Sequence, residues 1–112
     1  EHFAGAFPLW LSPVQTKIIP INDQCVEFAN KLKLNFENCG IRSEVDSRNE
    51  SLSYRIRESI KMKVPYICVV GENEIKNNTI SVRERGCSKQ EEYSIENFIK
   101  KLQQEIQERK LN

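Results

Sequence analysis

Apolar positions change from an extended to a helical period and back along the first part of the chain. A β-branched run over residues 14–21 predicts a strand. From Val26 to Phe36 apolar residues recur every three or four positions, which predicts an amphipathic helix that ends at Gly40. Residues 41–46 then return to an extended pattern. The order expected here is strand, helix, strand.

The middle of the chain repeats this alternation. After a polar loop at residues 47–50, Ser51 is placed to cap a second helix. The expected core stripe of this helix has members four residues apart: Leu52, Ile56 and Ile60. Pro65 ends the helix, because the residue before a proline avoids the helical region. Residues 66–70 are apolar on both faces, which indicates a central strand covered by helices on two sides.

The last part of the chain predicts a hairpin and a final helix. Residues 74–76 and 79–83 flank Asn77-Asn78, a pair that tolerates the positive φ angles of a tight hairpin turn. Ser94 is placed to cap the final helix, and Tyr93 before it is placed for a hydrophobic staple. The apolar face of this helix is Ile95, Phe98, Ile99, Leu102 and Ile106.

This order of elements predicts an α/β fold with three layers, α/β/α. We expect a mixed sheet of four to five strands with three helices, in which the first three strands are parallel. A length of 112 residues, 38% of them hydrophobic, is suited to one core. Residues 1–13 predict a packed connector and residues 14–112 the domain itself.

Composition excludes several classes of protein. The longest apolar run has five residues, far short of the ~20 that a membrane-spanning helix needs. No signal peptide precedes it, so a cytoplasmic protein without membrane contact is expected. The chain starts at Glu1 and not at Met, which indicates a fragment or a processed product. The four cysteines are widely spaced and His2 is the one histidine, so we expect free thiols and neither a metal site nor a disulfide scaffold.

Catalytic chemistry has little support in the residues themselves. The single histidine near the N-terminus makes a Ser-His-Asp or Cys-His arrangement implausible, and no phosphate-cradling glycine loop is present. Asp46 and Glu50 remain a candidate carboxylate pair with no partner that would fix them. The net charge is +1, but residues 48–63 hold five basic side chains against two acidic ones. A binding module, with groups that can read a base in the loop at residues 47–50, is favoured over a catalyst.

Five blocks of sequence fit together into one pattern. They are GAFPLWLSPVQ at residues 5–15, DSRNE at 46–50, YRIRE at 54–58, KVPY at 63–66 and SVRERG at 81–86. Together they resemble the C-terminal anticodon-binding domain of threonyl-tRNA synthetases, with the first block at the junction to the catalytic core. The likeness runs nearly from end to end.

The resemblance implies that the domain grips the anticodon arm and reads the second and third anticodon bases, a G and a U. By motif, the residues carried over are Asn49, Lys63, Glu74 and Arg83. Arg48 and Arg85 are implied as phosphate or loop contacts. Arg suits the O6 and N7 of guanine, a carboxylate its donor side, and Asn the edge of uracil. The family often has Arg where Lys63 stands, and Lys supplies a point charge without the planar fork.

The same resemblance implies the setting of the domain. Complete enzymes of the family attach threonine to its tRNA with ATP, Mg²⁺ and a zinc that recognises threonine, and they are homodimers. Those elements lie upstream of this segment, which by itself is expected to be non-catalytic and without cofactors. The implied partners are the anticodon loop of threonine tRNA and the catalytic domain of the same chain. Two alternatives stay open: a sister synthetase for proline, histidine or glycine, and a stand-alone accessory protein of this fold.

Overall fold

The computed structural model describes residues 8–87 and 89–108, and a five-stranded mixed sheet forms its centre. The strand order is β2-β1-β3-β4-β5, with β3 in the middle as the apolar run predicts. The first three strands are parallel and the last two are antiparallel to their neighbours. Their bounds are Thr16–Pro20 for β1, Ser43–Val45 for β2, Tyr66–Val70 for β3, Thr79–Glu84 for β4 and Gln90–Ser94 for β5.

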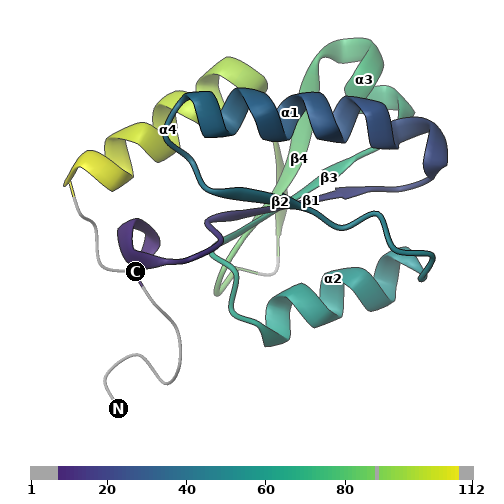
Figure 1. The fold of residues 1–112 in the computed structure, drawn as a ribbon, viewed down its shortest axis with the longest axis horizontal. Helices are drawn as coiled ribbons and strands as arrows, with labels where there is room; N and C mark the ends of the chain where they lie inside the picture. Colours follow the sequence, from purple (N-terminus) through teal and green to yellow (C-terminus); the bar gives the residue numbers. More distant parts are fainter. Residues whose placement is uncertain (1–7, 88, 109–112) are drawn as a thin grey trace.

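Helices cover both faces of this sheet. The α-helices are α1 (Val26–Asn38), α2 (Leu52–Lys61), α3 (Glu72–Asn77) and α4 (Ile95–Glu108), with short 3-10 turns at Leu9–Leu11 and Asp23–Cys25. Figure 1 shows α1 and α4 on one side of the sheet and α2 on the other. The predicted three-layer α/β/α architecture is confirmed, with four α-helices and five strands.

The larger part of the core lies between the sheet and the α1/α4 layer. Phe98 of α4 is fully buried, and its ring centroid lies 5.6 Å from that of Phe36 and 5.5 Å from that of Tyr66. Tyr93 packs on the same ring at 5.9 Å, while the backbone N–H of Asn97 donates to the Ser94 hydroxyl at 3.2 Å. The predicted cap and hydrophobic staple of the final helix are therefore confirmed.

The core on the α2 side is much smaller. Its buried members are Ile19, Ile67 and Val69, with Leu52 and Ile56 of α2 packed against them. The predicted stripe is wrong at its last position, because Ile60 is 48% exposed. Each step of four residues turns a helix by about 40° more than one full turn, so Ile60 has rotated out of the interface. Arg55 and Ser59 are the buried residues of α2.

The predicted hairpin at Asn77-Asn78 is wrong. Residues 72–77 form α3, which the Glu74 carboxylate caps by accepting the backbone N–H of Gly71 at 2.7 Å. Asn78 has the left-handed φ of 59° and ends that helix. The same φ serves helix C-caps and hairpin turns, so the residue type alone leaves both structures open. The hairpin of the structure joins β4 to β5, with Gly86 at a φ of 86°.

The segment before β1 is attached to the domain. Leu9 belongs to the large core, and the Gln15 side chain donates to its carbonyl at 2.9 Å. The guanidinium of Arg42, just before β2, donates to the carbonyls of Ser12 (2.8 Å) and Trp10 (3.1 Å). Residues 1–7, which hold the start of the predicted connector, lie outside the described residues.

The cysteines form no disulfide. Cys25 and Cys68 are buried, and burial raises the pKa of the Cys68 thiol above its ordinary range. Within residues 8–87 and 89–108 there is no group of three or more His, Cys, Asp or Glu side chains that could hold a metal ion. Over the same residues, no helix has the length and apolar character needed to cross a membrane.

Candidate nucleic-acid interface

On one face of the sheet, α2 covers the strands β1 and β3 and leaves β4 and β5 uncovered. Arg83 in β4 lies opposite Ile67 of β3, and Ser81 lies opposite Val69. Because Ile67 and Val69 belong to the α2-side core, Arg83 and Ser81 point to that side as well. The side chains that continue this surface on β5 are exposed: Gln90, Glu92 and Ser94. We call this uncovered α2 side of β4 and β5 the open face.

Arg83 borders a hollow beside the open face. Its volume is about 310 Å³, and its lining includes the apolar residues Ile60, Val64 and Ile67. The Arg83 side chain is half-buried, and its Nε has no hydrogen-bond partner within the described part of the chain. An unpartnered buried donor is costly unless a further group satisfies it. Arg83 thus has hydrogen-bonding capacity left over at the border of this hollow.

Lys63 and Arg85 lie at the same end of β3 as Arg83. Lys63 follows α2 in a left-handed conformation with a φ of 59°, and its carbonyl accepts from the Arg85 guanidinium at 3.0 Å. The backbone N–H of Arg85 donates to the Pro65 carbonyl at 2.8 Å. Arg85 therefore ties the turn before β3 to the end of β4, and this contact gathers the basic residues Lys63, Arg83 and Arg85 near one end of the sheet.

Glu74 lies at the opposite end of the open face, in the first turn of α3. One carboxylate oxygen accepts from the Gly71 backbone N–H at 2.7 Å and the other from the Ser81 hydroxyl at 3.3 Å. Ser81 and Arg83 are alternate residues of β4, so they share a face and lie about 7 Å apart along the strand. Glu74 is thus fixed at the border of the surface that Arg83 occupies, with acceptor sites remaining on its carboxylate.

Asn49 lies in the loop between β2 and α2. Its side chain is exposed and lines a hollow of about 90 Å³ with residues that follow β1, Asn22 and Asp23 among them. The loop follows the carboxyl end of a parallel strand, where ligands of open α/β sheets bind. Asn49 and Glu74 therefore belong to the carboxyl end of the parallel strands, and Lys63 and Arg83 to their amino end.

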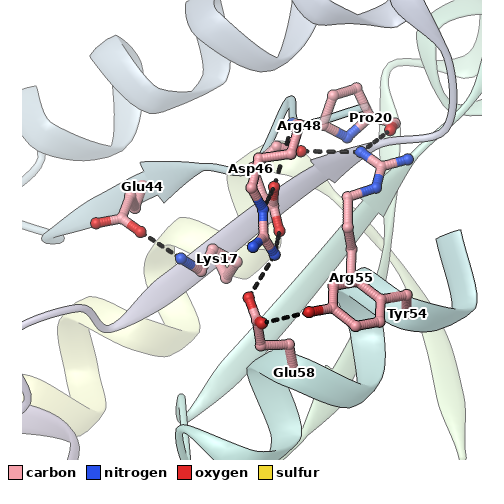
Figure 2. A network of polar contacts seen from close by, with 8 residues as sticks. All are labelled: Lys17, Pro20, Glu44, Asp46, Arg48, Tyr54, Arg55 and Glu58. Carbon is pink, nitrogen blue, oxygen red and sulfur yellow. Dashed lines mark hydrogen bonds and ion pairs between the residues drawn. The ribbon is translucent and has the colours of Figure 1, made fainter. Parts of the chain in front are cut away.

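The loop that carries Asn49 is held by its neighbour Arg48 (Figure 2). The guanidinium donates to both oxygens of Asp46 at 2.9 Å and contacts the Glu58 carboxylate of α2 at 2.5 Å. It also lies over the Tyr54 ring, 5.8 Å from the centroid. A planar guanidinium shared by two carboxylates and a ring fixes the direction of the loop.

Asp46 responds to this environment. Burial by itself raises the pKa of its carboxyl, but hydrogen bonds from the side chain and backbone of Arg48 outweigh burial and lower that pKa overall. The ion pair between the buried Lys17 and Glu44 lies nearby, and the charge of Lys17 acts on Asp46 in the same direction. Both oxygens of the Asp46 carboxylate are bound by Arg48, so the structure assigns Asp46 to holding the loop.

Arg55 is the residue of this region that the sequence pattern missed. Although it is charged, only 4% of it is exposed. One of its terminal nitrogens donates to the carbonyls of Pro20 and Asp46, both at 2.9 Å, and so joins the ends of β1 and β2 (Figure 2). A helical wheel would have found it, because position 55 lies on the inward side of α2 between Leu52 and Ile56.

Comparison with known proteins shows the family to which the chain belongs. A family model described as "Anticodon binding domain" matches residues 15–105, which is most of the chain. The chain belongs to the anticodon-binding domain family. The match spans all five strands, the helices α1 to α3 and most of α4, including the loop of Asn49 and the open face.

Curated relatives are similar over nearly the whole chain. The threonine–tRNA ligase of Desulforamulus reducens is 46% identical over 107 residues, which cover 96% of this chain and 17% of that protein. The threonine–tRNA ligase of Clostridioides difficile is 43% identical, with 97% of this chain and 17% of that protein covered. This anticodon-binding domain therefore spans about one-sixth of the length of these relatives.

Solved structures agree with the sequence comparison. The RNA-binding domain of threonyl-tRNA synthetase from Cryptosporidium parvum superposes with a TM-score of 0.87 at 29% identity, over 92% of this chain and 26% of that one. The prolyl-tRNA synthetase of the same organism gives 0.81 at 21% identity, over 93% of this chain and 23% of that one, a likeness of fold alone. The resemblance to the anticodon-binding domain of threonyl-tRNA synthetases is confirmed, and the proline enzyme is not favoured.

Proposed function

We propose that this domain recognises the anticodon of threonine tRNA as part of a threonine–tRNA ligase. The observation that carries the proposal is the position of Arg83. It projects from the open face of an anticodon-binding fold with a buried nitrogen that lacks a partner among the described residues. The relatives that match almost the whole chain are threonine–tRNA ligases, which supports the choice of tRNA.

The geometry suits reading of unpaired bases. An anticodon loop presents bases that are splayed out and can lie on a protein surface with their edges exposed to side chains. In the proposal Arg83 donates to the O6 and N7 of guanine, and Glu74 at the border of the same face accepts from the amino side of that base. Asn49 pairs with the edge of uracil, and Lys63 supplies positive charge beside Arg83.

Fixed loops would favour this readout. Arg48 and Arg55 hold the loop of Asn49 through contacts to Asp46, Glu58 and Pro20 that need no RNA. Arg85 does the same for the turn of Lys63. A surface ordered in advance loses less conformational entropy on binding, so more of the contact energy is left for affinity. Arg48 and Arg85 are thus proposed as loop-holding residues, with base contacts left to Asn49, Glu74 and Arg83.

The complete enzyme supplies the chemistry in this proposal. The domain contributes recognition, and threonine is activated with ATP and Mg²⁺ and transferred to tRNA by the catalytic domain of the same chain, which also carries the zinc. We propose that the enzyme acts in the cytoplasm as a homodimer. Its substrate specificity then has two parts, the amino acid read in one domain and the anticodon in this one.

Binding of anticodon stem-loops tests the proposal. The 112-residue chain is titrated with stem-loops that carry the threonine anticodon and with variants changed at one base. Arg83→Ala is expected to reduce discrimination at one base by about 1–3 kcal/mol while leaving the other positions unaffected. Lys100→Ala, an exposed lysine on α4 across the sheet, is the matched control. Equal loss for every anticodon would make Arg83 a phosphate contact and contradict its role in reading a base.

A further inference from the structure

Two cations on the outer surface of α2 have no role in the fold. We propose that Arg57 and Lys61 bind phosphates of the RNA strand next to the bases that are read, and so extend the interface from the open face across α2. This inference rests on the proposed function, because it adds a phosphate-binding surface to the same RNA site.

The local charge of the chain leads to these two residues. Residues 48–63 hold five basic side chains, and the structure separates them by what they contact. Arg48 is bound by two carboxylates and Arg55 by two backbone carbonyls, so both guanidinium groups already hold parts of the fold together. Lys63 already belongs to the turn beside Arg83. The basic residues that remain from this stretch are Arg57 and Lys61.

Both remaining residues are exposed and unengaged. Within the part of the chain that the structure describes, neither forms an ion pair or a hydrogen bond. Glu58 is the acidic residue between them, but its carboxylate is taken by Arg48 at 2.5 Å and by the Tyr54 hydroxyl at 3.1 Å. Glu58 is thus paired with Arg48 and Tyr54, and with neither Arg57 nor Lys61.

The surface around these cations is hollowed. A depression of about 330 Å³ is lined by Tyr54, Arg57, Glu58 and Lys61. Arg57 and Lys61 are four residues apart, so their side chains rise from one side of the helix with Cβ atoms about 5–6 Å apart. Two cations at this spacing beside a depression can contact one phosphodiester strand, with Tyr54 as an exposed flat neighbour.

This surface continues into the open face. Ile60, the residue before Lys61, lines the hollow that also holds Arg83. Arg57 precedes Ile60 by three residues and therefore lies one turn away on the same side of α2. A strand whose bases reach Arg83 would run past this side of the helix. Phosphates are the groups that such a strand presents at every nucleotide, and they complement exposed positive charge whatever the sequence.

Salt dependence separates phosphate contacts from base contacts. The measurement is the affinity of the full chain for the threonine anticodon stem-loop at several salt concentrations, with Arg57→Ala/Lys61→Ala compared with wild type. Each phosphate contact on a single strand contributes about 0.7 to the slope of log K against log salt, so the double variant should lose about 1.4. That equals about 25-fold less gain in affinity between 1 M and 0.1 M salt.

The control removes equal charge from the opposite face. Lys31→Ala/Lys100→Ala changes exposed residues of α1 and α4 and should leave the slope unchanged. Discrimination between anticodons should persist in the Arg57/Lys61 variant, because phosphates carry no sequence information. An unchanged slope in that variant, with wild type still selecting its anticodon, would overturn this inference and leave the proposed function intact. Wild type that binds no stem-loop would overturn both.

Discussion

The two faces of the sheet are joined to their helices by different kinds of interaction. On the α1/α4 side, aromatic rings around Phe98 fill a continuous apolar core. On the α2 side three buried aliphatic residues are accompanied by charged groups, and Arg55 and Arg48 connect strand ends to the helix through hydrogen bonds and ion pairs. The first side is built for stability. The second has less apolar contact and more fixed polar groups, which suits the proposed RNA-reading surface.

The largest effect on stability should follow the loss of the central ring of the aromatic cluster. Phe98→Ala removes a fully buried ring that contacts three others, so the free energy of unfolding should fall by about 3–5 kcal/mol. Urea denaturation measures this loss. RNA selectivity of the molecules that remain folded should not change, because no proposed contact lies on this side. A selective loss at one anticodon base would contradict the separation of the two faces.

Arg55 tests the polar attachment. Arg55→Met keeps much of the packing volume but leaves the carbonyls of Pro20 and Asp46 without their donor, so unfolding should become about 2–3 kcal/mol easier. Discrimination at the base that Asn49 is proposed to read should fall as well, since the loop loses its anchor. Arg57→Met on the exposed side of the same helix is the control, with a stability change within about 0.5 kcal/mol. Equal stability effects at both positions would refute the anchoring role.

Two serine caps offer a matched pair, one on each side of the sheet. Ser51 accepts from the Tyr54 backbone N–H at 3.1 Å, and Ser94 from that of Asn97 at 3.2 Å. Changing either to Ala should cost about 1 kcal/mol of stability, measured by thermal or urea unfolding. Ser51→Ala should also weaken binding of the anticodon stem-loop, because this cap adjoins the loop of Asn49. Ser94→Ala should leave binding of the stem-loop unchanged. A similar loss of RNA binding in both variants would contradict the link between the Ser51 cap and the loop of Asn49.

The smallest effect should appear in acid. The folded pKa of Asp46 is lowered, so its stabilising contribution is present above the ordinary pKa of about 4 and disappears as pH falls through the folded value. Wild type should therefore lose more stability than Asp46→Asn when the pH is lowered from about 5 to 2. Glu58→Gln removes the more exposed partner of Arg48, so it should reduce the pH dependence of stability less than Asp46→Asn does. Parallel profiles for wild type and Asp46→Asn would contradict the ion pair.

Long periodic segments made most of the fold predictable. The final helix and its cap follow from a helical period with one buried face, and the central strand follows from a continuous apolar run that is buried on both faces. The helix α3 is too short for a period to show, and the residue that ends it, Asn78, is equally suited to a hairpin. The local sequence is compatible with a short helix or with a hairpin, and the contacts of Glu74 with Gly71 and Ser81 favour the helix.

The sequence supplied candidate residues for the site but not the contacts that hold them in place. Exposed Asn49 and half-buried Arg83 were found through motif resemblance, and their places in the fold are compatible with binding. The role of Arg55 was hidden because a charged residue within a basic stretch indicates a solvated surface. Its burial depends on carbonyls of Pro20 and Asp46, which are up to 35 residues away along the chain and meet only once the parallel strands are aligned.

The open face of β4 and β5 also bears on how such domains diversify. Side chains such as Gln90 and Glu92 support no layer above them, so replacing them opens no cavity and costs the fold little. Mutations can accumulate on this surface and be selected for what they recognise alone. The aromatic cluster beneath has no such freedom. One scaffold can therefore acquire a new nucleic-acid preference through neutral steps on the open face, while the aromatic cluster that stabilises the fold is kept.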